Sequence, residues 1–132
     1  MTANDVQQPR LLILDDEEAI AYPIARYFAA RGWHTEIATE AEEGEALVDN
    51  RDYDLFILDL RLTSYGGAEG LDVLRRIRSR SPQIPVIVLS AIPSEELVDA
   101  ARAAGADRIL VKPQPLNFLA ELAAGLVGQP VG

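Results

Sequence analysis

Five short apolar runs alternate along the chain with longer segments of helical periodicity, and this alternation restricts the possible folds more than any other feature. The runs are nearly continuous in aliphatic residues, as strands of a parallel sheet are when helices cover both of their faces. We predict strands over residues 11–14, 35–38, 55–58, 86–89 and 109–111. A helix is expected after each strand, so the fold class is α/β with a five-stranded parallel sheet.

Apolar residues at spacings of three and four mark the helices between the strands. The clearest faces carry Ile20, Ile24, Tyr27 and Phe28, then Leu71, Leu74 and Ile77, and finally Leu116, Leu119, Leu122 and Leu126. Thr39 and Glu42 have the spacing of a capping box, and Ser94 is a suitable N-cap. Gly32 and Gly105 stand where helices are expected to end.

A chain of 132 residues fits one domain, which we place at residues 9–127, with flexible tails at 1–8 and 128–132. Right-handed crossovers give a doubly wound, flavodoxin-like sheet of order 2-1-3-4-5 with helices on both faces. Ligands of such sheets bind beyond the carboxyl ends of the strands, where the strand order reverses. The residues after the first and third strands are therefore the first candidates for a functional site.

The net charge of −9 disfavours direct binding to nucleic acid phosphates. No apolar run approaches the roughly 20 residues needed to span a bilayer. The polar opening MTANDVQQPR also lacks the apolar centre of a signal peptide. We therefore expect a soluble, cytoplasmic protein with no membrane insertion.

Three carboxylates follow the strands at the predicted switch point, namely Asp15, Asp16 and Asp59. Carboxylates brought together in this way repel one another and have raised pKa values unless a cation joins them. The chain has no cysteine and a single histidine, so any bound metal should be hard and oxygen-ligated. Mg²⁺ is the natural choice, because it is held by a few carboxylates and keeps waters that a phosphate can displace.

Ser90 follows the fourth strand and Lys112 the fifth, which places a hydroxyl and an ammonium at the same edge of the sheet. Lys112 is the only lysine beside eleven arginines, so the composition favours arginine wherever a generic positive charge is enough. An ammonium is a compact point charge that fits a crowded carboxylate pocket better than a guanidinium. We infer that position 112 needs an ammonium to reach a phosphate oxygen.

The segments LILDDEEA, LFILDLRL and PVIVLSA, and the Gly-Ala-Asp followed by VKP, resemble the response regulator receiver domains of two-component signalling. The resemblance covers residues 10–127. It implies a phosphoacceptor, Asp59; a Mg²⁺ site made of Asp15, Asp16, Asp59 and the backbone carbonyl of Arg61; phosphoryl contacts from Ser90, the Ala91 backbone and Lys112; and a switch pair, Ser90 and Ile109.

The resemblance also implies the partners and the type of chemistry. The phosphoryl donor would be a phosphohistidine on a sensor histidine kinase or histidine phosphotransfer protein, or a small acyl phosphate. Beyond self-catalysed phosphotransfer and autodephosphorylation, no enzymatic activity is expected, and the downstream target is unknown. In similar receivers the peptide bond that corresponds to Lys112–Pro113 is cis, and we expect the same here.

Three alternatives remain open. Asp15 and Asp16 are explained equally by a helix N-cap and its neighbour, although Asp59 is not. A phosphatase of the haloacid dehalogenase type would use Asp15 as its nucleophile, but it generally needs a cap or a longer chain and leaves Asp59 and Lys112 unexplained. A degenerate receiver would act only as a binding module, and the complete set of five signature residues argues against it.

Two departures from the family pattern concern the switch. The loop after Asp59 is about three residues longer than usual, and position 109, which is commonly aromatic, is Ile109. A β-branched aliphatic side chain has few rotamers and no hydroxyl to bury or expose. We therefore hypothesise that phosphorylation moves mainly residues 91–94 and 63–70, with Tyr65 as the moving aromatic group.

Overall fold

The computed structural model describes residues 8–61, 69–91 and 93–128, in which five strands alternate with five helices. The elements are β1 (Arg10–Leu14), α1 (Glu18–Ala29), β2 (His34–Ala38), α2 (Ala41–Asn50), β3 (Leu55–Leu58), α3 (Glu69–Arg80), β4 (Val86–Ser90), α4 (Glu95–Ala103), β5 (Arg108–Val111) and α5 (Leu116–Val127). The strands are parallel in the order β2-β1-β3-β4-β5, which confirms the predicted fold class and strand order. The predicted tails lie almost entirely outside the described residues, so their flexibility stays a prediction.

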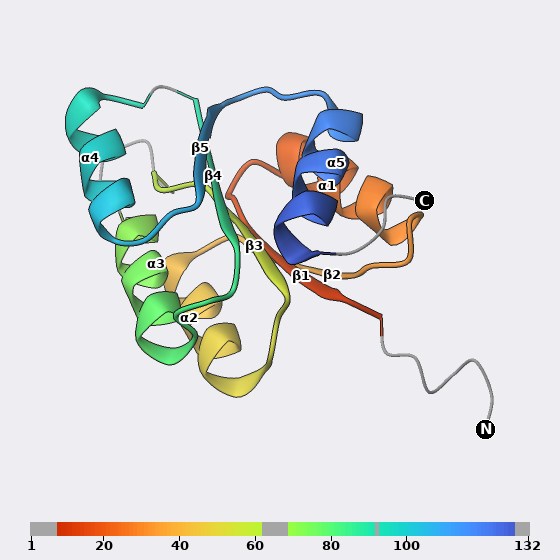
Figure 1. Cartoon of the computed structure of the whole chain (residues 1–132), viewed down its shortest axis with the longest axis horizontal. Coiled ribbons are helices and arrows are strands. Elements are labelled where there is room, and N and C mark those ends of the chain that lie inside the picture. The colour runs from red at the N-terminus through yellow and green to blue at the C-terminus, as the bar shows by residue number, and fades with distance from the viewer. Residues whose placement is uncertain (1–7, 62–68, 92, 129–132) are drawn as a thin grey trace.

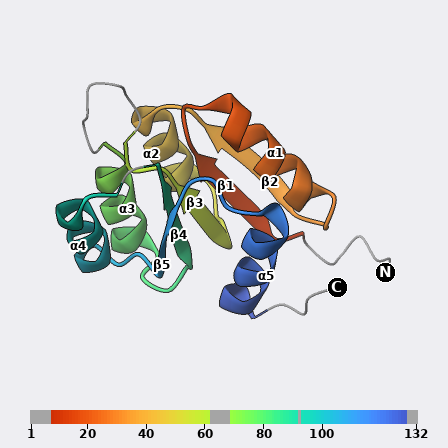
Figure 2. The same cartoon turned by 90° about the horizontal axis from the view of Figure 1, so that it is seen from above.

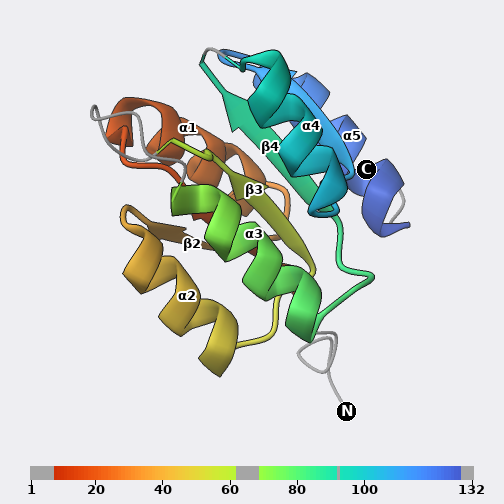
Figure 3. The same ribbon diagram turned by 90° about the vertical axis from the view of Figure 1, so that its left-hand side faces the viewer.

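The helices form two layers around the sheet. Figure 1 and Figure 2 show α1 and α5 on one face, and Figure 3 shows α2, α3 and α4 side by side on the other. The interior strand β1, which lies between β2 and β3, divides its side chains between the layers: Leu12 and Leu14 pack toward α2, α3 and α4, whereas Leu11 and Ile13 pack toward α1 and α5. All four are fully buried, which explains why the strand reads as one continuous apolar run.

Most of the predicted helix ends are confirmed. The Ser94 hydroxyl accepts a hydrogen bond from the Leu97 N–H at 3.1 Å, as an N-cap does. Gly32 and Gly105 have φ values of +94° and +103°, which residues with a Cβ rarely adopt. Both follow the last turn of a helix.

The predicted capping box at Thr39 and Glu42 is wrong. The second helix begins at Ala41, so its N-cap is Glu40, and the acidic residue at the third helical position is Glu43. The Glu43 carboxylate accepts the Thr39 N–H at 2.9 Å. The expected backward hydrogen bond therefore exists, but it is shifted by one residue because the helix starts later than predicted.

A polar cluster ties the edge strand β2 to the segment before β3. The Glu36 carboxylate accepts hydrogen bonds from the Tyr53 hydroxyl and the Arg51 guanidinium, and His34 lies 3.4 Å away. Burial alone would raise the pKa of Glu36, but the Tyr53 hydrogen bond and the neighbouring cationic groups hold it below its ordinary value. The pKa of Tyr53 is raised by burial and by the facing carboxylate.

We predict that Glu36→Gln destabilises the domain in a pH-dependent way. The folded state binds the Glu36 proton more weakly than the unfolded chain, so this stabilisation is complete above the ordinary glutamate pKa and is lost as the pH falls below it. The variant should lose about 1 kcal/mol of unfolding free energy at pH 7 and progressively less toward pH 3, measured by urea denaturation. The exposed Glu121→Gln is the control, and an equal loss at both pH values would contradict the prediction.

Candidate functional site

The backbone at the carboxyl edge of the sheet continues its hydrogen bonding one residue beyond the strands. The Asp15 N–H donates to the Ala38 carbonyl at 3.0 Å, and the Asp59 N–H donates to the Leu14 carbonyl at 2.8 Å. The Lys112 N–H donates in the same way to the Ser90 carbonyl, also at 2.8 Å. The parallel sheet therefore fixes the backbone of the two aspartates and the lysine at one edge.

The side chains of these residues meet. The Lys112 ammonium nitrogen lies 2.8 Å from Oδ2 of Asp15, 2.8 Å from Oδ2 of Asp59 and 3.0 Å from Oε1 of Glu17. The side chains of Lys112, Asp15 and Asp59 are 4%, 4% and 6% exposed. One cation thus neutralises part of the charge of two carboxylates, those of Asp15 and Asp59, that are almost completely removed from water.

The second oxygen of each buried carboxylate is held by backbone. The Glu17 N–H donates to Oδ1 of Asp15 at 2.9 Å, and the Arg61 N–H donates to Oδ1 of Asp59 at 3.0 Å. Burial raises the pKa of Asp15 above its ordinary value, although the Lys112 hydrogen bond acts in the opposite direction. Burial would lower the pKa of Lys112, but its hydrogen bonds to the carboxylates raise it instead.

Four acidic residues offer oxygens to a metal ion. Asp15, Asp16, Glu17 and Asp59 each place one carboxylate oxygen within 4.8 Å of the others. Such hard donors fit Mg²⁺, which prefers carboxylates and water, better than any metal that needs sulfur or imidazole. Three of the four residues were predicted from the sequence, and Glu17 was missed although it directly follows the predicted pair.

The other predicted residues occupy the expected positions. Ser90 is buried at the end of β4, one residue beyond the predicted strand end, and Ala91 follows it at the surface. Ile109 lies half-buried in β5 and packs against the core layer shared with α4. The Lys112–Pro113 peptide bond is cis, as expected.

Gly70 holds the start of α3 against the backbone of the site, which the sequence did not reveal. Its N–H donates to the Leu60 carbonyl at 3.0 Å. A Cβ at this position would lie only 2.4 Å from the Asp59 carbonyl oxygen and 2.6 Å from the Leu60 Cα. These neighbours are backbone atoms that cannot rotate away, so the close approach requires glycine.

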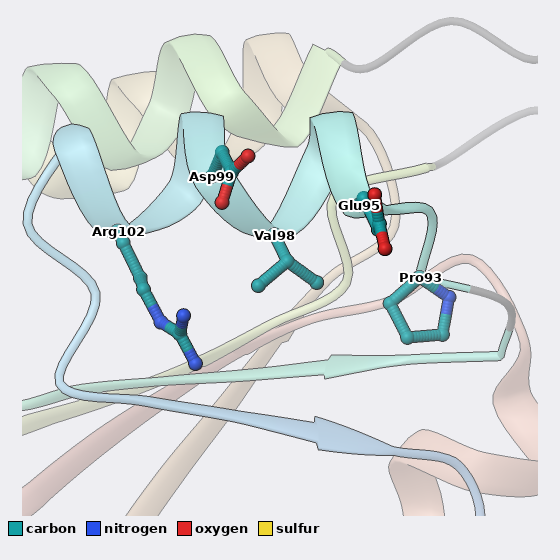
Figure 4. A pocket seen from close by; sticks show the side chains of 5 residues that line it. All are labelled: Pro93, Glu95, Val98, Asp99 and Arg102. Atoms are coloured by element: carbon teal, nitrogen blue, oxygen red, sulfur yellow. The ribbon is translucent and has the colours of Figure 1, made fainter.

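A shallow pocket on α4 lies apart from the carboxylate cluster. Figure 4 shows the side chains that line it, which are Pro93, Glu95, Val98, Asp99 and Arg102. None of them belongs to the acidic group or contacts Lys112. The candidate functional site is therefore the carboxylate cluster at the edge of the sheet.

Comparison with known proteins identifies the family. The sequence pattern of the response regulator receiver domain matches residues 11–124. The chain belongs to the response regulator receiver family. Receiver domains are signalling modules of two-component systems rather than ordinary enzymes, and membership implies a cognate histidine kinase. The match lends no support to the haloacid dehalogenase alternative.

Individual relatives agree with this assignment. The receiver is 35% identical over 113 residues to the alginate biosynthesis transcriptional regulatory protein AlgB of Pseudomonas aeruginosa, covering 86% of this chain and 24% of AlgB. It is 36% identical over 107 residues to the photosynthetic apparatus regulatory protein RegA of Rhodobacter capsulatus, covering 81% of this chain and 56% of RegA. The chain thus spans about a quarter of one relative and just over half of the other.

Among solved structures, the receiver is similar to a CheY-like response regulator receiver domain protein from Methanospirillum hungatei JF-1. The TM-score is 0.86 with 28% sequence identity, and the match covers 92% of this chain and 95% of that chain. None of the helices in the described residues is long and apolar enough to cross a membrane.

We predict that Lys112→Met strongly destabilises the receiver when divalent ions are absent. The substitution leaves Asp15 and Asp59 buried without a counter-ion, which should cost about 3 kcal/mol of unfolding free energy. Urea denaturation in chelator-containing buffer measures the loss. Arg75→Met is the matched control, because it breaks an exposed pair with Asp72 and should cost less than about 1 kcal/mol. Equal losses in the two variants would show that the ammonium does not stabilise the cluster.

Proposed function

We propose that this receiver accepts a phosphoryl group on Asp59 from the phosphohistidine of a sensor histidine kinase or a histidine phosphotransfer protein. The observation that carries the proposal is the position of the Asp59 carboxylate, buried at the switch point and 2.8 Å from the only lysine of the chain. A structural role alone does not account for a nearly buried carboxylate that shares its counter-ion with a second buried carboxylate.

The proposed transfer forms a P–O bond to Asp59 and breaks the P–N bond of the phosphohistidine. A carboxylate oxygen of Asp59 attacks the phosphorus atom, the P–N bond of the phosphohistidine breaks, and the imidazole nitrogen keeps the bonding electron pair. The product is an acyl phosphate, which water hydrolyses later to return the free carboxylate. Catalysis of this kind rests mainly on positioning and on neutralisation of charge.

The remaining site residues receive roles that follow from their chemistry. The Lys112 ammonium, the Ser90 hydroxyl and the Ala91 N–H are donors for the phosphoryl oxygens. Asp15, Asp16, Asp59 and the Arg61 carbonyl would hold Mg²⁺. When bound, the metal supplies positive charge that neutralises the phosphoryl oxygens and the surrounding carboxylates.

We further propose a cytoplasmic location, which is usual for response regulators. The names of AlgB and RegA describe regulators of alginate biosynthesis and of the photosynthetic apparatus. This chain matches only part of either protein, so we assign no downstream target.

We predict that acetyl phosphate with Mg²⁺ adds one phosphoryl group to the wild-type receiver and none to Asp59→Asn, because the amide is a much poorer nucleophile than the carboxylate. Intact-mass spectrometry measures the addition. The control is Asp52→Asn, an exposed position before β3, which should be labelled like the wild type. Equal labelling of Asp59→Asn would overturn the assignment, and no labelling of any protein by either acetyl phosphate or a cognate kinase would favour the degenerate binding module.

A second prediction concerns the switch. Ile109 packs against the core layer that includes Leu97 and Ala101 of α4, and its branched aliphatic side chain has few rotamers, so its reorientation should change the surface of that helix only slightly. Amide NMR spectra with and without beryllofluoride should shift most over residues 91–94 and 63–70. Tyr65, with the rest of residues 62–68 and Ile92, lies outside the described residues, so its role follows from the sequence alone. Large shifts confined to α4, β5 and α5 would contradict the hypothesis.

A further inference from the structure

Glu17 is an unusual N-cap residue. It precedes α1, and its carbonyl accepts the first hydrogen bonds of the helix, from the N–H groups of Ile20 and Ala21. Side chains that favour this position are short and accept a hydrogen bond from the helix. The Glu17 side chain makes no such capping bond and instead reaches Lys112, 95 positions away in the sequence. Its carboxylate therefore serves the site rather than the helix.

Three carboxylates surround the Lys112 ammonium, which donates hydrogen bonds to Glu17 and Asp59 and forms an ion pair with Asp15. An ammonium has three N–H donors and no acceptor. In the resting receiver three carboxylates lie within 3.0 Å of the Lys112 nitrogen, from Asp15, Glu17 and Asp59. A phosphoryl group that forms on Asp59 brings further oxygens and negative charge to this ammonium, and it therefore competes with the two carboxylates that remain.

Exposure to solvent determines which carboxylate can leave the Lys112 ammonium at the lowest cost in free energy. Asp59 itself becomes the acyl phosphate, so Asp15 and Glu17 are the two carboxylates that can yield. The Asp15 side chain is 4% exposed and would remain buried without a counter-ion if it lost Lys112. The Glu17 side chain is 58% exposed and can return to water after it leaves the ammonium. Of the three, Glu17 alone is not among the ligands proposed for Mg²⁺, although its carboxylate belongs to the same acidic cluster.

We propose that Glu17 is a positioning residue that holds one N–H of Lys112 in the resting receiver and yields it to the phosphoryl group. The inference rests on the proposed function, because it requires a phosphoryl group to arrive at Asp59. It makes Glu17 a competitor of the phosphoryl group. Removal of its charge should therefore favour the phosphorylated form of the receiver over the resting form.

The single lysine allows a direct test by NMR. Lysine labelled with ¹⁵N gives one side-chain ammonium resonance, which belongs to Lys112 without further assignment. The spectra are recorded for the wild type, Glu17→Gln and Glu18→Gln, each alone, with Mg²⁺, and with Mg²⁺ and beryllofluoride. Glu18→Gln is the matched control, because it removes the same charge from the exposed neighbouring residue, which makes no contact with Lys112.

The resonance of Glu17→Gln should differ from that of the wild type in the absence of beryllofluoride and coincide with it when beryllofluoride is bound. Glu18→Gln should follow the wild type throughout. A difference of equal size in the free and bound states would overturn the proposal, because Glu17 would then stay on the ammonium. If the resonances of Glu17→Gln and the wild type coincide without any ligand, or with Mg²⁺ alone, the proposal is also overturned.

Affinity provides a second measurement. At saturating Mg²⁺, established separately for each variant, Glu17→Gln should bind beryllofluoride about two- to five-fold more tightly than the wild type and Glu18→Gln, as expected for removal of one exposed ion pair from the resting state. If Glu17→Gln binds beryllofluoride no more tightly than the wild type does, Glu17 does not compete with the phosphoryl group. If beryllofluoride fails to bind all three proteins, the proposed function itself falls, whereas binding with an unchanged affinity refutes only the role of Glu17.

Discussion

One buried ionic contact sets the conditions for the rest of the site, namely the ammonium of Lys112 among the carboxylates of the sheet edge. Parallel strands bring their carboxyl ends together, so acidic residues after β1 and β3 are placed side by side whatever their mutual repulsion. The contact between Lys112 and both Asp15 and Asp59 offsets this repulsion. It also places a compact positive charge beside Asp59, the residue on which the proposed phosphoryl group would form.

The chain separates the tasks of its two kinds of basic residue. Arg78 joins α3 to the segment before β5, since its guanidinium donates to the Gly105 carbonyl at 2.7 and 2.9 Å and to Asp107 at 2.9 Å. Arg76 similarly binds Asp49 of α2. The planar fork of arginine suits such fixed bridges between elements. The one lysine lies in the carboxylate cluster, where a compact point charge reaches Asp15, Glu17 and Asp59 at once.

Much of the fold could be predicted because its signals are local. Buried parallel strands are apolar without interruption, and Ser94 and Gly105 act on the helix ends beside them. The strand order then brought Asp59 and Lys112 together. The role of Glu17 could not be predicted in this way, because its partner is distant in sequence and an acidic residue before a helix is common. The close approach of Gly70 depends on backbone positions that only a three-dimensional structure supplies.

The contact of Gly70 with the backbone of Asp59 and Leu60 brings the two ends of the intervening segment together, so that they act as adjoining anchors. Residues added between such anchors cost little, about 0.6 kcal/mol for each doubling of loop length. Such added residues need not move either of the two anchors. Loop length beside Asp59 can thus diverge between relatives while the carboxylate stays in register with the sheet. For a protein engineer, the stretch of sequence between Leu60 and Gly70 is a candidate insertion point for a reporter or a binding peptide.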